Sequence, residues 1–581
     1  MNLAARPSPA RVSAAAAAQL PRWALAVVLA VYSLAGLFGR DPWYQDDAAG
    51  FGVMWTMAHG TAVDWWLPNV IGVPHLEEGP LPFWMGALCI TLFGSWLGDA
   101  LAARLSSLVW MLLTTGSLWY ATYRLARREE AQPIAFAFGG EASGRDYACM
   151  LADIAALLFL ATIGVVVRMH ETTAETASIA WVAFALYGLA ISLNAPARGA
   201  LATGVAVGAL LLSRGPLPAA MLLLGMVLAT RWSVRGARLA LFAAITGGVA
   251  VACFGLWFVG ALLVDRAAAE TYFQGWSAWA VGSVGVAQLY QLTWIARNIL
   301  WYTWPLWPLA LWALYSWRHS LTAPHIAAPA TAFAAMFAAM LLSGAVNEAA
   351  LMLTVPPLVV LGAFGASTLR RGAENVIDWF AIALFSLLSL AAWGYFIAML
   401  TGIPPKMAAS VARMTPGFTP AFDAAAVLLG ILTTLVWLAL VIWRVRTNPP
   451  MLWRGPVLAA AGLTALWALL NALFLPAVNY NRTFAGIAQQ AAAQLVSAGR
   501  PDACVVAHHL LPAHRILFAF HGGIRFAPPG GAQSCPFALH RDTQRTHLDD
   551  EPPPGSWTPL WEGQWPTRRE ETIRIYRRPG T

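Results

Sequence analysis

The residues best suited to chemistry in this chain come directly after its first long apolar segment. Two adjacent acids, Asp46 and Asp47, stand in the stretch YQDDAAGFGVMW of a chain in which only 11% of residues are charged. Carboxylates can serve as a general base or as metal ligands. The alternative is that both acids are solvated loop residues or cap a helix at a membrane surface. We take Asp46 and Asp47 as the candidate catalytic residues.

A second polar stretch, PHLEEGPLPFW, follows about thirty residues later and contains His75, Glu77 and Glu78. Imidazole and carboxylate groups are common metal ligands. His75 and Glu77 are therefore candidate ligands of a divalent metal ion, together with an Asp or with another histidine such as His59 or His170. The competing interpretation is a surface loop whose acids are solvated.

Two later stretches combine arginine with polar neighbours at the ends of apolar runs. VRMHETTAE contains Arg168, Glu171 and Glu175, and LLLSRGPLP places Arg214 before a Gly-Pro break. A guanidinium can bind a phosphate through two parallel hydrogen bonds. Charged residues at the end of a span can also simply reach toward water. These two stretches are therefore candidate phosphate sites only if they lie close to the acidic stretches at residues 44–55 and 74–84.

The composition identifies the kind of protein that must position these groups. The chain has 581 residues, of which 59% are hydrophobic, and apolar runs of about 20 residues, long enough to cross a bilayer, recur from Trp23 onward. The sequence therefore predicts a polytopic α-helical membrane protein. The net charge of +8 comes mostly from arginines between apolar runs, which is a topology signal, and we expect no nucleic-acid partner.

Thirteen candidate spans follow from these apolar runs. They cover residues 22–39, 99–123, 147–167, 173–193, 199–213, 216–230, 239–263, 298–317, 326–344, 351–369, 376–400, 423–444 and 455–476.

A fourteenth apolar stretch, Leu81–Gly98, is short and interrupted by Pro82 and Gly86. If this stretch does not cross the membrane, the basic loops fall on the inner face together with the N-terminus, as the positive-inside rule requires. Those loops hold Arg124, Arg127, Arg128, Arg145, Arg231, Arg235, Arg238, Arg370, Arg371, Arg444, Arg446 and Arg454.

This topology divides the chain into an inner tail (1–21), a transmembrane domain (22–476) whose first outer loop spans 40–98, and an outer soluble domain (477–581). In the last domain TFAGIAQQAAAQLVSAG predicts a helix, and ACVVAHHLL, GGIRFAPPG and ETIRIYRRP predict strands of a small α/β fold. Cys504 and Cys535 can pair there if the domain faces an oxidising compartment.

The motifs in this order resemble those of the GT-C membrane glycosyltransferases. Specifically, they are similar to the bacterial members of the protein O-mannosyltransferase group (family 39), including the aminoarabinose transferase that modifies lipid A. The matching pieces, which lie mostly within residues 22–230, are YQDDAAGF, EEGPLPFWMGALCITLFG with AARLSS, RMHETTAE, SRGP and MLTVPPLVVL.

One departure from the family pattern concerns the charge of the first outer loop. The position of a family lysine thought to contact the donor phosphate falls on Glu78, and that of the following proline falls on Gly79. Glu77 keeps the position of a glutamate that binds metal in a relative. Another cation must then hold the phosphate, and the candidates are Arg104, Arg168, Arg214, Arg297 and Lys406.

The resemblance implies a multi-pass enzyme of the bacterial inner membrane with its active site facing the periplasm. It would transfer a sugar, with inversion, from a polyprenyl-phosphate donor to an envelope lipid, glycan or protein, and it would act as a monomer. Asp46 would serve as the general base or position the acceptor. His75, Glu77 and Glu78 would hold a divalent metal, the possible cofactor, or orient the acceptor. The alternatives are a flippase or transporter of lipid-linked sugars and a non-catalytic membrane scaffold.

Overall fold

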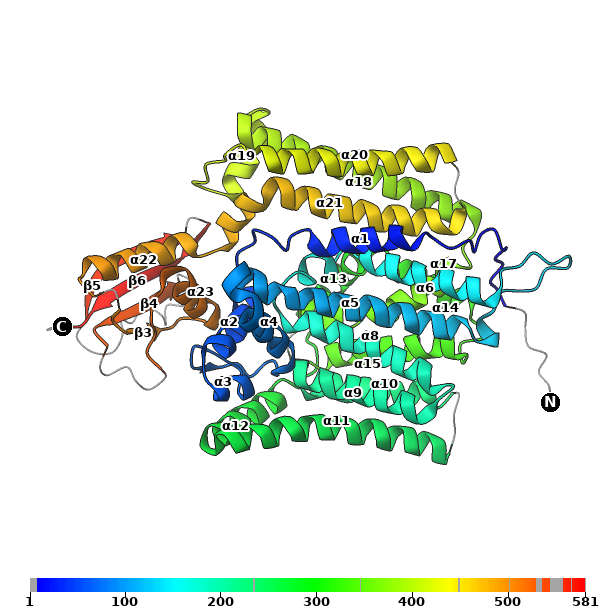
Figure 1. The fold of residues 1–581 in the computed structure, drawn as a ribbon, viewed down its shortest axis with the longest axis horizontal. Coiled ribbons are helices and arrows are strands. Elements are labelled where there is room, and N and C mark those ends of the chain that lie inside the picture. The colour runs from blue at the N-terminus through cyan, green and yellow to red at the C-terminus, as the bar shows by residue number, and fades with distance from the viewer. Residues whose placement is uncertain are drawn as a thin grey trace.

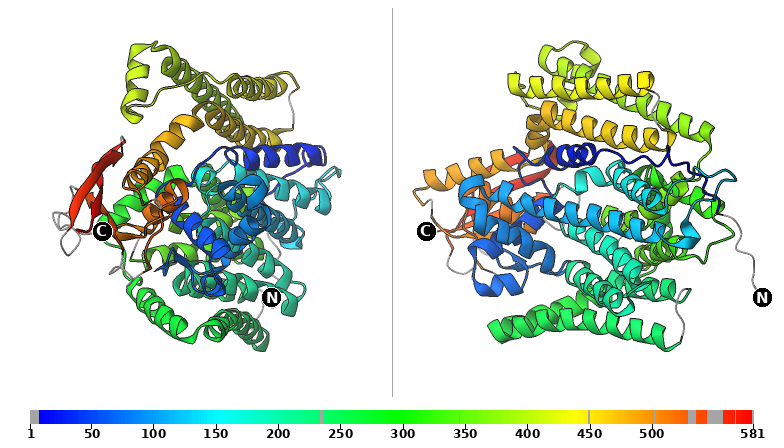
Figure 2. Two further views of the ribbon diagram at one scale, coloured as in Figure 1. Left: turned by 60° about the vertical axis from the view of Figure 1, so that its left-hand side comes forward. Right: turned by 45° about the vertical axis from the view of Figure 1, so that its right-hand side comes forward.

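The computed structural model describes residues 8–232, 236–344, 346–447, 450–500, 502–528, 535–543, 557–565 and 567–579. Arg235 therefore lies outside the described residues. Long helices run roughly side by side along one direction, and a small domain with a β-sheet covers one end of the bundle (Figure 1). Two turned views show the same arrangement (Figure 2).

Nine helical segments within the described residues are long and apolar enough to cross a membrane. They are α5 (Asp99–Ala126), α8 (Ala174–Ser192), α9 (Pro196–Arg214), α11 (Ala237–Val264), α15 (Pro324–Leu341), the pair α16 (Glu348–Met352) and α17 (Val355–Ala366), α18 (Arg371–Thr401), α20 (Ala424–Thr447) and α21 (Met451–Arg482).

The remaining four of the thirteen expected spans fall on helices with fewer than 18 residues. The prediction of a multi-pass helical bundle is thus confirmed. Helix length and composition support nine of the thirteen expected spans. The four shorter helices are α1 (Arg22–Leu34), α6 (Gly144–Leu160), α10 (Pro216–Thr230) and α14 (Leu306–Ser316).

Shorter helices connect these elements. They are α2 (Asp46–His59), α3 (Ala62–Trp66), α7 (Val165–Arg168), α12 (Arg266–Gly282), α13 (Leu289–Tyr302) and α19 (Pro405–Met414), with the 3-10 turn Glu129–Ala131 and the hairpin strands β1 (Asn69–Val70) and β2 (Val73–Pro74).

The apolar stretch that we expect not to cross the membrane forms one continuous helix, α4 (Leu81–Leu97). It packs against α2 through Gly86, where an added Cβ would lie 2.1 Å from the sulfur of Met54. Both helices lie at the end of the bundle that carries the small domain (Figure 1). That α4 stays out of the bilayer core remains a prediction.

The N-terminal segment lies at the opposite end of the bundle. Ser13 forms an isolated bridge with Glu141 in the loop after α5, and Arg22 forms an ion pair with Asp153 of α6 at 2.7 Å. The indole nitrogen of Trp453, near the start of α21, donates to the carbonyl of Ala18. The described N-terminal segment and the terminal domain thus lie at opposite ends of the bundle (Figure 1), as an odd number of crossings predicts.

The C-terminal domain is an α/β unit, as the sequence predicts. Its helices α22 (Ala485–Ser497) and α23 (Pro512–Gly522) accompany a sheet of order β3-β4-β6-β5, with β3 (Val505–His508) parallel to β4 (Phe537–Thr543). The other neighbours, β5 (Thr558–Trp565) and β6 (Arg568–Arg577), pair antiparallel.

Two of the three expected strands correspond to β3 and β6, and the expected helix corresponds to α22. The expected strand GGIRFAPPG is wrong, because its described part makes only an isolated bridge between Phe526 and Val505. Helix α23 was not expected from the sequence, since its short length weakens the helical periodicity that would indicate it.

The terminal domain is docked on the first outer loop. One apolar cluster includes Phe51 of α2, Phe83 of α4 and Ile516 of α23, and the rings of Phe51 and Phe520 lie 5.0 Å apart. The guanidinium of Arg515 donates to the carbonyl of Ile71 in the β1–β2 turn at 3.1 Å. The domain and the loop therefore form one packed unit at this end of the bundle.

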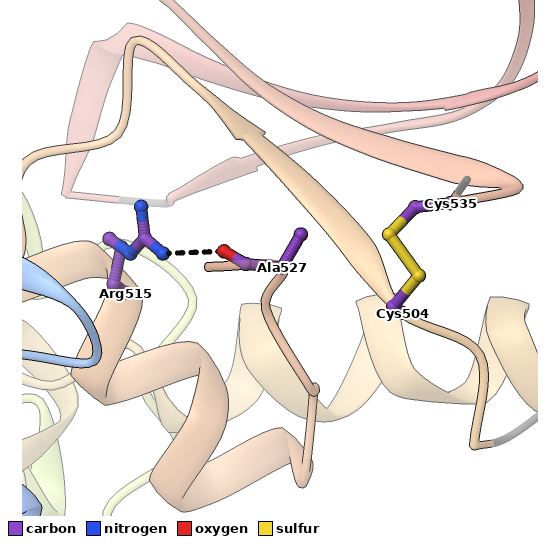
Figure 3. The surroundings of a disulfide bond; sticks show 4 residues. All are labelled: Cys504, Arg515, Ala527 and Cys535. Atoms are coloured by element: carbon purple, nitrogen blue, oxygen red, sulfur yellow. Dashed lines mark hydrogen bonds between the residues drawn. A yellow bond between two sulfur atoms is a disulfide. The ribbon is translucent and has the colours of Figure 1, made fainter. Parts of the chain in front are cut away.

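A disulfide joins Cys504, just before β3, to Cys535, just before β4 (Figure 3), with their Cα atoms 5.2 Å apart. Within the described residues, the remaining cysteines are free, and they are Cys89, Cys149 and Cys253. The pairing agrees with the expectation for a domain in an oxidising compartment.

We predict that exchange of both Cys504 and Cys535 for serine lowers the stability of the terminal domain by about 3 to 4 kcal/mol. The reason is the lost restriction of the unfolded chain, which grows with the length of the closed loop. Limited proteolysis of the purified full chain measures this effect. Thiol tagging of the unfolded wild type should attach three tags before reduction and five after it, and five tags without reduction would contradict the pairing.

Candidate active site

Two adjacent cavities lie at the end of the bundle next to the C-terminal domain. One, of about 480 Å³, has the more polar lining and is called the polar cavity. The other, of about 450 Å³, has a mainly apolar lining and is called the apolar cavity. The two share part of their lining: Glu77, Arg214, Trp279 and Asn347. The shared wall makes them two compartments of one candidate site.

The polar cavity is formed by several outer segments. Its ionisable lining residues are Asp46, His75, Glu77, Glu78, Glu175 and Arg214. The residues Leu511, Pro512 and Ala513, at the start of α23, complete the wall from the C-terminal domain. The structure thus brings together the acids of the first outer loop and the arginine of the SRGP corner, which are far apart in the sequence.

The apolar cavity lies between α10, α12 and α15. Pro216, Leu217 and Pro218 line it from the start of α10, and Met336, Ala339 and Met340 line it from α15. Its position beside the polar cavity leaves Arg214 at the boundary between an apolar and a charged environment.

Local backbone geometry explains why Arg214 stands at this boundary. Helix α9 ends at Arg214, because Gly215 adopts a φ of +85° and Pro216 begins α10. Only glycine takes such a conformation without strain. The guanidinium Nη1 donates to Oε1 of Glu78 at 2.5 Å and lies 3.6 Å from Oε1 of Glu175.

Glu78 is held on its other side by a histidine. Its Oε2 lies 3.2 Å from Nε2 of His75, so the carboxyl group bridges His75 and Arg214. Burial raises the pKa of Glu78, and the charge of Glu175 raises it further. The hydroxyl of Tyr272 on α12 donates to the carbonyl of His75 at 2.8 Å, which fixes this part of the loop.

Asp46 belongs to a second group of charges, centred on Arg168. Nη1 of Arg168 donates to Asp46 at 3.1 Å and to Glu171 at 3.0 Å, and its Nε donates to Glu348 at 3.1 Å. The side chain of Asp46 is 60% exposed. Burial raises the pKa of Glu171 to about 7, although the charges of Arg168 and Arg40 lower it. The arginine thus orients a carboxylate that solvent and a substrate can reach.

Asp47, the second candidate catalytic acid, is only 2% exposed. Its Oδ1 accepts from the amide and hydroxyl of Thr172 at 2.7 and 2.8 Å, and its Oδ2 accepts from the amide of Trp43 at 2.9 Å. Burial alone would raise the pKa of Asp47, but Arg40, Arg104 and these amides together lower it. The structure therefore assigns Asp47 a positioning role beneath the cavity.

Arg104, expected as a candidate for the phosphate, is 1% exposed. It donates to the carbonyls of Arg40 and Asp41 and lies 3.6 Å from Asp47. These contacts use both Nη groups inside the protein, so Arg104 fixes the start of the first outer loop instead of facing a substrate.

Two other expected phosphate ligands lie away from the candidate site. Arg297 is on α13 and Lys406 is on α19, both are exposed, and neither lines either cavity. We expected both residues in outer loops, but the apolar pattern behind that expectation carries no information about the distance between such segments. Of the five candidate cations, Arg214 alone lines the two cavities.

The expected metal site is not formed by the residues that the structure describes. No group of three or more His, Cys, Asp or Glu side chains among them could hold a metal ion. His59 pairs with Asp99 at 2.8 Å, and both ring nitrogens of His170 lie within hydrogen-bond distance of backbone carbonyls. His75 and Glu77 thus lack the histidine partners that we considered, and we derive no step through a metal.

The sequence did not point to Trp279, Asn347 or Glu348, nor to the wall from the C-terminal domain. Asn347 caps α16, where its side chain accepts from the amide of Ala350 at 3.1 Å. An Asn-Glu pair before an apolar run is a recognisable helix start, and this signal could have located Asn347 and Glu348. No signal in the sequence indicates that Leu511–Ala513 reach the cavity, because that contact depends on docking of the domain.

Comparisons with known proteins give no match to a family model or to a curated protein sequence. Solved structures do match. ArnT from Cupriavidus metallidurans bound to undecaprenyl phosphate aligns with a TM-score of 0.62 and 16% identity over 95% of this chain and 97% of that chain.

The apo form of the same protein aligns with a TM-score of 0.63 and 16% identity over the same shares. The Archaeoglobus fulgidus oligosaccharyltransferase in its apo form aligns over 88% of this chain and 65% of that chain at 12% identity, with a TM-score of only 0.45, and we argue nothing from it. The alignment with ArnT over nearly the whole length means that this chain has the fold of that GT-C membrane glycosyltransferase, which confirms at the level of fold the resemblance seen in its motifs.

Proposed function

We propose that this protein transfers a glycosyl group from a polyprenyl-phosphate-linked sugar to an acceptor. One observation carries the proposal. Such a donor consists of an apolar tail, a phosphate and a sugar in that order, and the site consists of an apolar cavity, Arg214 and a polar cavity in the same order. The ArnT structure of the same fold contains undecaprenyl phosphate, which supports a lipid-phosphate donor.

In this proposal Arg214 holds the donor phosphate. A guanidinium at a partly dry boundary forms strong, charge-assisted hydrogen bonds to a phosphate and stabilises the charge that develops on it as the sugar leaves. Arg214 lies where the two cavities meet, and its side chain is 18% exposed. Arg214 therefore takes the phosphate-binding role that a lysine is thought to have in the family, since this chain has Glu78 at the position of that lysine.

Asp46 acts as the general base when the acceptor is a hydroxyl group. The acceptor oxygen attacks the anomeric carbon, its proton passes to the carboxylate of Asp46, and the bond from that carbon to the phosphate oxygen breaks with inversion. Arg168 orients Asp46 through the contact at 3.1 Å. If the acceptor is itself a phosphate, no proton is removed and Asp46 only positions it.

The acceptor approaches from the side of the terminal domain. Leu511–Ala513 line the polar cavity next to Asp46, so an envelope lipid, glycan or protein has to pass this wall. We propose that the site faces the periplasm of a bacterium, from the inner membrane. We further propose that the enzyme acts as a monomer.

A lipid flippase or transporter, the alternative expectation, would carry its substrate through a pathway near the middle of the membrane. The polar cavity lies instead at the end of the bundle, where residues of the C-terminal domain form part of its wall. This location supports transfer at one face of the membrane.

We expect Asp46→Asn to lower turnover by about a hundredfold or more, since the amide cannot accept the proton. Binding of undecaprenyl phosphate should stay within about twofold of wild type, because the phosphate contacts Arg214 and not Asp46. The measurement is transfer from a panel of polyprenyl-phosphate sugars to envelope extracts. The matched control is Asp502→Asn, because Asp502 is an exposed acid in the C-terminal domain. Unchanged turnover in a folded Asp46→Asn variant would remove Asp46 from the reaction.

We expect Arg214→Gln to weaken binding of undecaprenyl phosphate by about tenfold or more, the scale of a lost charge-assisted hydrogen bond. Binding is measured by native mass spectrometry of the full chain. Arg266→Gln serves as the control, because Arg266 forms an exposed ion pair with Glu270 on α12. If both variants bind the lipid as tightly as the wild type, Arg214 is not the phosphate ligand.

A further inference from the structure

A third cavity, of about 500 Å³, lies between α14 and α18 and shares no lining residue with the candidate active site. Residues of α6 and α21 complete its wall. The rings of Trp304 and Phe380, which both line this cavity, lie 5.6 Å apart. Every lining residue except Glu374 is uncharged. This space, called the seam cavity, is therefore an apolar slot with a single ionisable group in its wall.

Glu374 marks the end of the seam cavity that is remote from the C-terminal domain. It lies in the first turn of α18, and Leu452 lines the cavity from the first turn of α21. The next residue, Trp453, bonds to Ala18 of the N-terminal segment, which lies at the end of the bundle opposite the C-terminal domain (Figure 1). This end of the cavity therefore belongs to the face that the sequence predicts to be the inner one.

The carboxyl group of Glu374 is buried without a partner. The residue is 8% exposed, but it forms no hydrogen bond or ion pair with any residue that the structure describes. Arg454 of α21 acts on it through its charge only. A buried carboxylate that lacks both a paired cation and hydrogen-bond donors is strongly unfavourable. An ionisable residue at membrane depth in such a position marks a candidate binding site.

A second acid increases the demand for a cation in this region. Asp378, one turn after Glu374, is fully buried and binds Arg444 of α20 at 3.0 and 3.1 Å, through Oδ2 in both contacts. Its Oδ1 accepts no hydrogen bond within the described part of the chain. A Cβ at Gly455, which lines the seam cavity, would lie 3.8 Å from this oxygen. The arginine that faces these two acids is thus already bound to one of them.

The start of α18 carries a cation, an anion and an apolar surface in order. Arg371 is exposed and precedes Glu374 by three positions, so the two side chains share one face of the helix. Ile377 and Ala381 follow on that face and line the seam cavity. The Cα–Cβ bonds of a helix tilt toward its N-terminus, so the Glu374 side chain leans toward Arg371 and the membrane surface.

The chemistry that matches this order is that of a phospholipid with a primary ammonium group. Its phosphate complements Arg371, its ammonium group complements Glu374, and an acyl chain fills the apolar slot. Like a lysine side chain, an ethanolamine headgroup offers three N–H donors to a carboxylate. A choline headgroup offers none, and an anionic glycerol headgroup brings no cation to Glu374.

We propose that the seam cavity binds one acyl chain of a phosphatidylethanolamine molecule from the inner leaflet, and that Glu374 binds the ammonium group of this lipid. The bound lipid joins α14 to α18 at the end of the bundle remote from the candidate active site. The inference goes beyond the proposed function and does not depend on it, because none of its residues lines the polar or the apolar cavity.

The test uses the full chain, delipidated in detergent, and three lipids with identical acyl chains: phosphatidylethanolamine, phosphatidylcholine and phosphatidylglycerol. Native mass spectrometry measures the affinity for each lipid. We expect phosphatidylethanolamine to bind about tenfold or more tightly than the other two, the scale of one charge-assisted hydrogen bond. Glu374→Gln should lose this preference, because its amide has no charge. The matched control is Glu129→Gln, an exposed acid in the loop after α5, which should keep it.

A second measurement locates the bound lipid. Phosphatidylethanolamine with a photoactivatable group in its acyl chain should cross-link to peptides of α14 and α18 in the wild type, and much less in Glu374→Gln. Equal affinity of the wild type for the three lipids overturns the inference, as do cross-links confined to other helices and a preference that persists in a folded Glu374→Gln variant. Displacement of the label by undecaprenyl phosphate also overturns it, because the cavity would then hold a polyprenyl tail. These outcomes leave Asp46 and Arg214 untested, so they are distinguishable from a failure of the proposed function.

Discussion

The burial of one carboxylate, that of Asp47, organises the outer end of this protein. A buried charge is tolerated only when hydrogen bonds and opposite charges replace its hydration. Asp47 receives both, from the turn at Thr172, from the amide of Trp43 and from Arg40 and Arg104. These partners come from three separate parts of the chain, namely residues 40–43, Arg104 and Thr172, and their contacts with the buried carboxylate of Asp47 hold these parts together.

The burial of Asp47 also determines where the exposed acid Asp46 points. Because Asp47 points into the protein at the first turn of α2, its neighbour Asp46 points toward the cavity and toward Arg168. The same helix supplies Phe51 to the apolar cluster shared with the C-terminal domain. The two adjacent acids therefore have different environments. The carboxylate of Asp47 is buried and fixes the backbone, whereas that of Asp46 remains exposed.

Much of the architecture could be predicted from the sequence, because a bilayer demands long apolar helices and the basic loops report their orientation. Asp46, Glu78 and Arg214 could also be chosen as candidates, since charged residues are rare in such a chain, and all three line the polar cavity. The sequence could not predict which of the candidate side chains lie close to one another in the folded protein. Asp47 and Arg104 were both candidates from the sequence, and the structure shows that both are buried, at 2% and 1% exposure. Arg297 and Lys406 carried the right charge, but the fold places them outside both cavities.

The wall that Leu511–Ala513 contribute to the polar cavity has a consequence for how the protein is made. These residues follow all the helices of the bundle in the sequence and therefore leave the ribosome after them, and their domain contains the disulfide between Cys504 and Cys535. A bundle whose helices have all inserted still has an open site. The final shape of the two cavities therefore appears only after this domain has folded and docked on the bundle, so a newly synthesised chain completes the candidate site after its helices have formed.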